Sequence, residues 1–331
     1  MTAPRDRVSV FAPATVANVA SGFDVLGFAL DTPGDSVTLL RSSEKGVRVT
    51  SITGDQGRLP RDPKKNTAAV AVAAFLDKVG HPFGVEISLD KRMPLSSGLG
   101  SSAASAVAAV TAANILAGAP LSPIDLLPFT MEAERVACGS AHADNVAPSL
   151  LGGFVLIRSY EPLDVVRLPV PKGLSCAVVH PHAELRTEDA RRVLKKEIRL
   201  SDAIRQWGNL AALVAALYNG NLQLLGRSLQ DVVAEPARSL LIPGFAGVKS
   251  AALAAGALGC SISGSGPSIF ALCASPDDSA RAGAAMVAAF TTAGLESDLY
   301  LSSVNPNGPV VETESAPAGR RDESAPAGRR K

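Results

Sequence analysis

The stretch Met93–Ala104, MPLSSGLGSSAA, places serines and two glycines between two apolar runs of different periodicity. Before it, apolar residues alternate through 85–89, which predicts a β-strand. After it, residues 101–116 consist mainly of strong helix formers, and Gly118 and Pro120 follow where a helix would end. The sequence therefore predicts a strand, a glycine-rich loop and a helix in direct succession.

This arrangement predicts a binding site for an anion such as a phosphate. The free N–H groups and the positive end of the helix dipole point at one spot. Gly98 and Gly100 permit positive φ angles, and the hydroxyls of Ser101 and Ser102 suit phosphate oxygens or magnesium. From these residues alone, simple helix capping and a dinucleotide fingerprint ending at Ala103 stay open. A Walker A loop is excluded because no Lys-Ser or Lys-Thr follows the second glycine.

The rest of the chain alternates strands and helices, which predicts an α/β (α+β) protein. Near the N-terminus, a strand through 8–12 is expected to give way to a loop at Pro13. Further helices are expected in 121–138, where Pro128 would kink or restart the helix, and near 188–197, 201–219, 221–235 and 277–294. Strands are expected in 152–160, 175–180 and on both sides of residue 265. The prolines after residue 160 indicate a domain boundary. The predicted division is 1–165, 166–310 and a low-complexity, disordered tail over 311–331 that repeats ESAPAGRR.

Composition favours a small-molecule partner. The 331-residue chain carries 32 Lys and Arg against 31 Asp and Glu, a net charge of +1, so no strong field recruits nucleic acid or an anionic membrane. Aromatic residues are only 4% of the chain, which leaves few platforms for stacking bases. No apolar run approaches the roughly 20 residues of a membrane helix. The N-terminus does not resemble a secretory signal, so a cytoplasmic location is expected.

The cysteines and histidines predict neither disulfides nor a metal centre. Cys138, Cys176, Cys260 and Cys273 form no C-x-x-C pair, and the four histidines show no H-E-x-x-H spacing. The cysteines are therefore expected to be buried small apolar residues, and no protein-held transition metal is expected.

Three segments resemble the superfamily of galactokinases, homoserine kinases, mevalonate kinases and phosphomevalonate kinases (GHMP kinases). They are the P-x3-G-L-G-S-S-A loop at 94–103, PATVANVASGFDVLGFAL at 13–30 and GCSISGSGPSIFAL at 259–272. Asn18 and Asp24, together with EAERVACGSAHADNVAPSLLGG, LRTEDARR and EPARSLLIPG, resemble the homoserine kinase branch. The resemblance extends over about residues 8–305.

The resemblance implies a two-domain kinase fold, with a ribosomal-protein-S5-like N-terminal domain, a ferredoxin-like C-terminal domain and a cleft between them. It implies ATP and Mg²⁺ as cofactors, L-homoserine as the phosphate acceptor and a possible homodimer. The nucleotide would be bound by residues in and around the loop: Asn66, Pro94, Leu95, Ser96, Ser97, Gly98, Leu99, Gly100, Ser101, Ser102 and Gly264. Ser102 and Glu134 would hold the magnesium.

An amino-acid substrate needs a carboxylate for its ammonium and guanidinium groups for its carboxylate. The substrate residues implied by the resemblance meet that need: Asn18, Asp24, His142, Thr187, Arg191 and Arg238. The catalytic set would be Ser102, Glu134 and Asn145. Because an asparagine accepts no proton at neutral pH, we expect direct attack by the substrate hydroxyl.

Plainer interpretations of single residues stay open at this point. Asn18 and Asn66 are candidate caps, Asp24 a turn residue and Glu134 an exposed helix acid. For the whole protein, the alternatives are another GHMP kinase and a catalytically silent nucleotide-binding protein.

Overall fold

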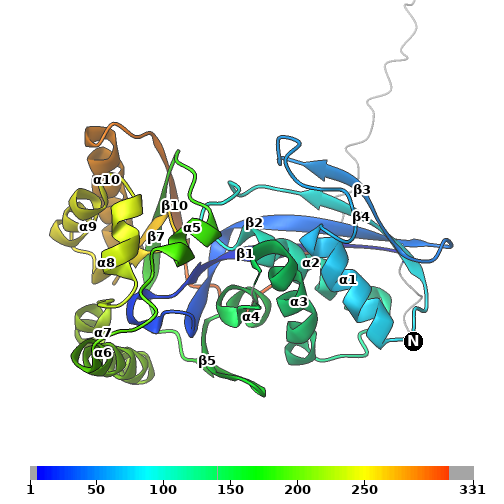
Figure 1. Ribbon diagram of the computed structural model, residues 1–331, viewed down its shortest axis with the longest axis horizontal. Coiled ribbons are helices and arrows are strands. Elements are labelled where there is room, and N and C mark those ends of the chain that lie inside the picture. Colours follow the sequence, from blue (N-terminus) through cyan, green and yellow to red (C-terminus); the bar gives the residue numbers. More distant parts are fainter. Residues whose placement is uncertain (1–5, 140, 313–331) are drawn as a thin grey trace, which may run out of the picture.

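Two β-sheets organise the chain in the computed structural model, which describes residues 6–139 and 141–312 (Figure 1). The first has the order β11-β1-β2-β4-β3, with β5 paired to β2 and β6 to β5, and the second has the order β10-β7-β9-β8. The strands of the first sheet are β1 (Arg7–Ala17), β2 (Leu26–Ser42), β3 (Val47–Thr53), β4 (Gly84–Asp90), β5 (Phe154–Tyr160), β6 (Leu163–Leu168) and β11 (Val310–Glu312). Those of the second are β7 (Ser175–Pro181), β8 (Gly259–Ile262), β9 (Ile269–Cys273) and β10 (Ser297–Ser303).

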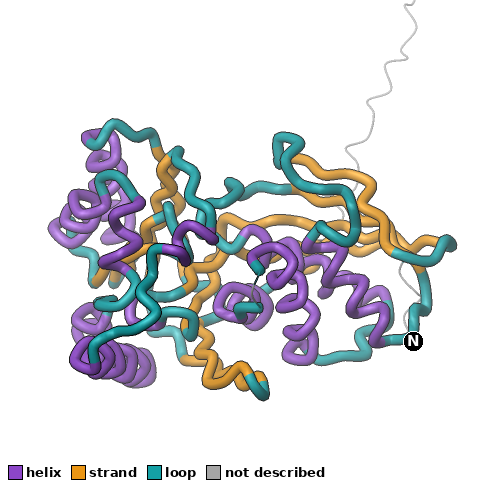
Figure 2. Tube along the Cα trace, in the orientation of Figure 1, coloured by secondary structure: helices purple, strands orange, loops and turns teal. Residues whose placement is uncertain are grey.

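Four helices gather beside the first sheet, as Figure 2 shows. They are α1 (Thr67–Lys78), α2 (Ser101–Leu116), α3 (Leu127–Cys138) and α4 (Ala143–Leu151). The central one, α2, packs on β1 and β2 and also on α1, α3 and α4. Nearly all its side chains are buried, and its alanines let neighbouring elements approach closely from every side. The alanine-rich run after the loop thus forms the centre of a helical layer.

The second sheet belongs to a β-α-β-β-α-β unit of the ferredoxin-like kind. Between β7 and β8 lie α5 (Thr187–Arg192), α6 (Leu200–Asn219), α7 (Leu222–Ser228), α8 (Glu235–Arg238) and α9 (Phe245–Ala254), and α10 (Pro276–Thr292) precedes β10. One core lies between this sheet, α9 and α10, while Phe270 contributes to the larger core of the first domain. The Phe270 and Phe28 rings meet edge to face with centroids 6.1 Å apart, so the two domains share packed apolar surface.

The main sequence predictions of the fold are confirmed. β4, the loop 91–100 and α2 follow in the predicted order, and the α/β class and the two-domain kinase fold agree with the structure. Cys176, Cys260 and Cys273 are buried and free. The side chain of Cys138 lies outside the described residues.

Several boundaries were wrong for identifiable reasons. β1 does not end at Pro13 but continues to Ala17, because a register shift between Pro13 and Thr15 accommodates the proline. In 121–138, the restart expected at Pro128 is present: the segment divides into the short 3-10 helix Pro123–Leu126 and α3, with Pro128 in the first turn of α3. By contrast, α5 ends at Arg192, and the helix expected over 221–235 ends at Ser228.

The chain passes from one sheet to the other after β6, between Leu168 and Ser175. The predicted boundary at residue 165 falls inside β6. Of the predicted tail, Val311 and Glu312 belong to β11, and 313–331 lie outside the described residues. No helix in 6–139 or 141–312 is long and apolar enough to cross a membrane.

Candidate active site

A cleft of about 660 Å³ receives side chains from both domains. The first domain contributes the segment after β1, the loop before α1, the end of β4, the loop 95–102, α3 and α4, and the second contributes the segments around α5, Arg238 and Gly264. Among the site residues expected from sequence, the lining includes Asn18, Asp24, Asn66, Leu95, Ser96, Ser97, Gly98, Gly100, Ser101, Ser102, Glu134, His142, Asn145, Thr187, Arg191, Arg238 and Gly264. Pro94 and Leu99 do not line it, and the Leu99 side chain is buried in the core.

The loop before α2 has the backbone of an anion cradle. Ser96, Gly98 and Gly100 all have positive φ, and Gly100 occupies the N-cap position of α2 in a left-handed conformation. No serine therefore caps α2, and the simple capping interpretation of the loop is wrong. The Ser97 hydroxyl is buried in the cleft wall without a hydrogen-bond partner among the described residues. Such an orphaned donor fits a phosphate oxygen.

Close packing explains why the loop carries glycine. A Cβ on Gly98 would lie 2.4 Å from the Ser263 carbonyl oxygen, and one on Gly100 would lie 2.2 Å from Thr15 Oγ1. The Ser263 hydroxyl also donates to the Gly98 carbonyl at 2.8 Å. The third glycine-rich segment, 263–266, thus packs directly on the loop that opens α2.

The hydroxyl of Ser102 donates to Glu134 Oε1 at 2.7 Å. Glu134 comes from α3 and is only 6% exposed, so it is not an exposed helix acid. Ser102 and Glu134 therefore present oxygen atoms to the cleft at the N-terminus of α2, beside the loop. Within the described residues no group of three or more His, Cys, Asp and Glu is arranged to hold a metal.

Asp24 and Arg191 form a two-pronged ion pair in the cleft. Arg191 Nη1 donates to Asp24 Oδ2 at 3.2 Å, and Nη2 donates to Oδ1 at 3.0 Å. His142 Nδ1 lies 4.0 Å from Asp24 Oδ1, and burial lowers the pKa of His142. Thr187 begins α5 four residues before Arg191, and its hydroxyl lies 3.4 Å from that of Ser265.

Asn18 connects the two halves of the cleft. It lies at a positive φ after β1, its amide donates to the Gly264 carbonyl at 2.7 Å, and its Oδ1 accepts from the Asp24 N–H at 2.9 Å. Its side chain therefore fixes the loop that carries Asp24 and joins that loop to 263–266.

Arg238 is a buried cation with 3% exposure. Its Nε donates to the Ala190 carbonyl at 3.1 Å, its Nη1 donates to the Gly264 carbonyl at 3.0 Å, and its guanidinium lies over the Phe23 ring. Burial and the nearby Arg191 lower its pKa. These bonds fix the plane of the guanidinium and use two of its five N–H donors, so the group can still bind an anion in the cleft.

Asn145 and Asn66 each make bonds that orient their amides. Asn145 Oδ1 accepts from Thr15 Oγ1 at 2.7 Å, and both side chains lie beside Gly100. Asn66 caps α1 by accepting from the N–H groups of Ala68 and Ala69, and it donates to the Pro60 carbonyl. Capping therefore accounts for the polar atoms of Asn66, although the residue also lines the cleft.

The comparisons with known proteins agree with this geometry. The model of the GHMP kinase N-terminal domain matches residues 66–153, and the model of the GHMP kinase C-terminal domain matches 213–292. Homoserine kinase of Chlorobium phaeobacteroides (strain BS1) is 54% identical over 316 residues, which are 92% of this chain and 99% of that protein. The chain belongs to the GHMP kinase family.

Solved structures extend the comparison. The crystal structure of homoserine kinase from Cytophaga hutchinsonii superposes on this GHMP kinase with a TM-score of 0.92 at 59% identity, covering 94% of this chain and 99% of that one. L. major mevalonate kinase in complex with R-mevalonate shares the fold, with a TM-score of 0.69, at 16% identity over 92% of this chain and 99% of its own.

Sequence reasoning missed two buried charged residues that line the cleft of this GHMP kinase. Asp144 precedes Asn145 in the first turn of α4, and burial together with the Asp24 charge raises its pKa to about 7. Lys91 lies between β4 and the loop and is also buried. Asp144 stands in the quoted HADN segment, where its charge was a usable signal, but nothing in the sequence indicates that Lys91 folds inward.

Proposed function

We propose that this GHMP kinase transfers the γ-phosphoryl group of ATP to the side-chain hydroxyl of L-homoserine, giving O-phospho-L-homoserine for threonine biosynthesis. One observation carries the proposal: a single cleft joins an anion cradle to the Asp24–Arg191 pair and Arg238. The near full-length similarity to curated homoserine kinases supports the same substrate.

The nucleotide end of the cleft is the loop 95–102. The helix N-terminus and the orphaned Ser97 hydroxyl would bind the triphosphate oxygens. The Ser102 hydroxyl and the Glu134 carboxylate are hard oxygen ligands of the kind that Mg²⁺ uses beside phosphates. When bound, Mg²⁺ neutralises charge that develops on the transferring phosphoryl group.

The acceptor end suits a zwitterion. The substrate ammonium would bind Asp24, and the substrate carboxylate would bind Arg191 and Arg238. The bound amino acid would then replace the Asp24–Arg191 ion pair with a partner for each of the two charges. Asn18 holds Asp24 in place, and His142 and Thr187 border the same space. The hydroxyl of L-homoserine lies one methylene group further from the α-carbon than that of serine, so it would extend toward the loop.

The substrate hydroxyl attacks directly in this proposal, and its proton leaves with the phosphate or to water. Asn145 lies beside Gly100 and orients the reacting groups without accepting the proton. Asp144 offers a second route, because its pKa near 7 would let it accept a proton.

The test is ADP release from Mg-ATP by the purified protein with L-homoserine, L-serine, L-threonine, mevalonate or galactose supplied separately. We expect kcat/KM for L-homoserine to exceed the others by at least about tenfold, as a site built around substrate polar groups discriminates. Preferred turnover of mevalonate or galactose would instead make the protein another GHMP kinase. ATP binding without any turnover would make it a silent nucleotide-binding protein.

The proposal includes a cytoplasmic enzyme of two domains, which the structure divides between Leu168 and Ser175, that binds no nucleic acid and forms a homodimer. Sedimentation of the purified protein tests the dimer directly.

A further inference from the structure

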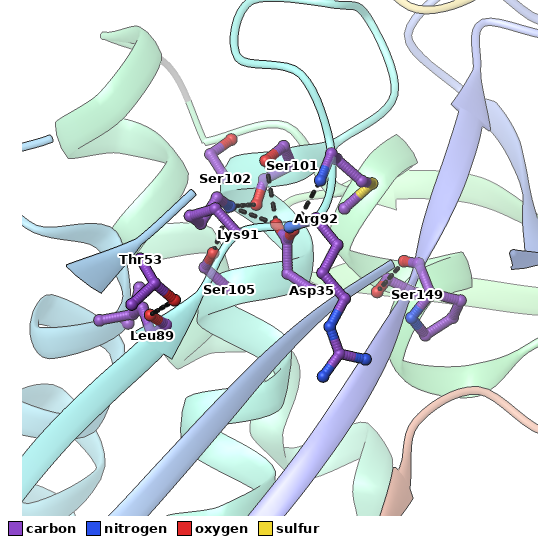
Figure 3. Close-up of polar contacts among 12 residues, drawn as sticks. Asp35, Thr53, Leu89, Lys91, Arg92, Ser101, Ser102, Ser105 and Ser149 are labelled. Carbon is purple, nitrogen blue, oxygen red and sulfur yellow. Dashed lines mark hydrogen bonds and ion pairs between the residues drawn. The ribbon is translucent and has the colours of Figure 1, made fainter. Parts of the chain in front are cut away.

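An ion pair between Asp35 and Lys91 is buried beneath the loop that opens α2 (Figure 3). The two side chains are 1% and 2% exposed. Asp35 lies on β2 and Lys91 directly follows β4, so the pair joins two neighbouring strands of the first sheet. Lys91 also lines the cleft, whereas Asp35 does not, and no role was assigned to either residue above.

The Asp35 carboxylate contacts both ends of the loop. Its Oδ1 accepts from the backbone N–H groups of Arg92 at 2.8 Å and Met93 at 3.2 Å, where the loop leaves β4. Its Oδ2 accepts from Ser101 Oγ at 2.9 Å, where α2 begins. One buried group thus holds both ends of the segment 92–101.

Lys91 strengthens the same connection from the other side. Its Nζ donates to the Ser101 carbonyl at 2.9 Å, to Ser105 Oγ at 2.7 Å and to Asp35 Oδ2. An ammonium group has three N–H donors, and each has an acceptor here. Lys91 therefore acts on the loop and on the first turn of α2, not as a direct phosphate ligand.

Burying two charges is costly unless excellent geometry and further hydrogen bonds compensate. Burial lowers the pKa of Lys91, and the Asp35 charge opposes that shift. An apolar pair would fill the same space at less electrostatic cost, but it would leave the N–H groups of Arg92 and Met93 and the Ser101 hydroxyl without their acceptor. The hydrogen bonds to the loop and to α2, and not core stability, therefore explain why a charged pair is buried at this position.

The cradle needs such a constraint. Ser96, Gly98 and Gly100 hold positive φ angles. The two glycines adopt this conformation readily but lose much conformational freedom when it is fixed, and at Ser96 it is strained. An anion site binds tightly when its N–H groups already point at the ligand, because ordering them on binding costs free energy.

We propose that the Asp35–Lys91 pair is a positioning unit that holds both ends of the phosphate loop in its nucleotide-binding conformation. The proposal rests on the proposed function only for the identity of the loop's ligand, a nucleotide polyphosphate.

The test measures Mg-ADP affinity by calorimetry for Asp35→Asn, for Lys91→Met and for the double variant. Each single variant breaks the pair, and we expect Mg-ADP affinity to fall by at least about tenfold, equal to about 1.4 kcal/mol. The double variant should lose about as much as either single variant, because residues that act as a unit are non-additive. Since ADP binding needs no acceptor, this readout does not depend on L-homoserine being the substrate.

The matched control is Asn114→Ala at the other end of α2. Asn114 is buried, donates to the Leu121 carbonyl at 2.9 Å and accepts from the Leu121 N–H, so its loss destabilises the same helix away from the loop. We expect Asn114→Ala to lower the melting temperature while its Mg-ADP affinity stays within about twofold of the parent, as for a site distant from the ligand.

Ser105→Ala keeps the test decisive if the ion-pair variants do not fold. It removes one Lys91 contact without leaving a charge unpaired, and we expect a smaller loss of Mg-ADP affinity, about two- to fivefold for one hydrogen bond. Parent affinity in the folded ion-pair variants, or in Ser105→Ala if only that variant folds, would overturn the proposal and leave the pair a purely structural feature.

Discussion

Gly100 is the residue at which three distant segments meet. It ends the phosphate loop, and Thr15 of β1 and Asn145 of α4 both lie against its Cα. The sequence predicted the glycine's backbone role, because the motif and the helix that follows are local. It did not predict the two contacts, because they depend on how β1 and α4 pack around α2.

Replacing Gly100 with alanine should therefore disable nucleotide binding. At φ 68 the new Cβ would lie 2.2 Å from Thr15 Oγ1 and 2.8 Å from Asn145 Oδ1, so the loop or its neighbours must move. We expect kcat/KM for ATP to fall by about 100-fold or more, as for misplaced catalytic geometry. Steady-state kinetics measures this loss.

Gly118→Ala is the control for Gly100→Ala. Gly118 also has a positive φ, of 86°, but open space surrounds its Cα. This substitution should cost about 1 kcal/mol of stability from backbone strain alone and leave kcat/KM for ATP unchanged. Equal kinetic losses in both variants would show that strain, and not the contacts of Gly100, decides the effect.

Asp144 should make stability depend on pH in a defined direction. Its pKa is about 7 in the folded protein against 3.8 for the free carboxyl, so the folded state binds its proton more tightly. The stability that this proton gives is complete below about pH 4 and is lost as pH rises through 7. Asp144→Asn should therefore melt at a higher temperature than the parent at pH 8, and the difference should shrink toward pH 4. A melting-temperature difference that does not change with pH would contradict the assignment.

The same variant distinguishes the two routes for the proton. Direct attack predicts that Asp144→Asn and the parent share one pH dependence of kcat/KM. If instead the parent shows an ionisation near pH 7 that the variant lacks, Asp144 is the proton acceptor.

At the scale of elements, the sequence predicted what local pattern controls. α2 begins and ends where the helix formers and the following Gly118 indicated. The prediction failed where tertiary pairing overrides local signals: Pro13 lies inside β1 because the strand continues past it with a shifted register against β2. Glu134 was also ambiguous, because its burial depends on the packing of α3 beside α2 and not on its own helix.

Variants of Asn66, at the N-terminus of α1, can distinguish a helix-capping role from a nucleotide-binding role. Asn66→Ala removes the acceptor for the N–H groups of Ala68 and Ala69 and should cost about 1 kcal/mol of stability. Asn66→Asp keeps that acceptor and should restore most of the loss. Chemical denaturation measures both.

If Asn66 only caps α1, KM for ATP stays at the parent value in Asn66→Asp. A higher KM for ATP in that well-folded variant would instead show that the amide contacts the nucleotide, as the family resemblance implies.

At the scale of the whole molecule, the cleft exists because two domains share a packed surface. Sequence order alone could not bring Arg238 to Gly264, or Asn18 to Gly264, since these contacts span 26 and 246 residues. The resemblance to GHMP kinases named most of the lining residues in advance. It could not supply the Asp24–Arg191 pairing or the ion pair at Asp35 and Lys91, which depend on side-chain geometry.

The C-terminal boundary gives a prediction about the intact molecule. Glu312 accepts hydrogen bonds from the hydroxyls of Ser9 and Ser36, and β11 pairs with β1. Deleting 313–331 should therefore leave kcat and the melting temperature at parent values. Deleting 310–331 should lower the melting temperature, because the hydroxyls and the β1 edge lose these partners. A large loss of activity from the shorter deletion would mean that the tail contributes to catalysis.

The central claim is phosphoryl transfer to the L-homoserine hydroxyl, and ³¹P NMR of the reaction mixture tests it most directly. With Mg-ATP and L-homoserine, the account predicts one new phosphomonoester resonance that grows in step with ADP and matches authentic O-phospho-L-homoserine. Release of ADP with inorganic phosphate alone, or no change in the spectrum, would contradict it.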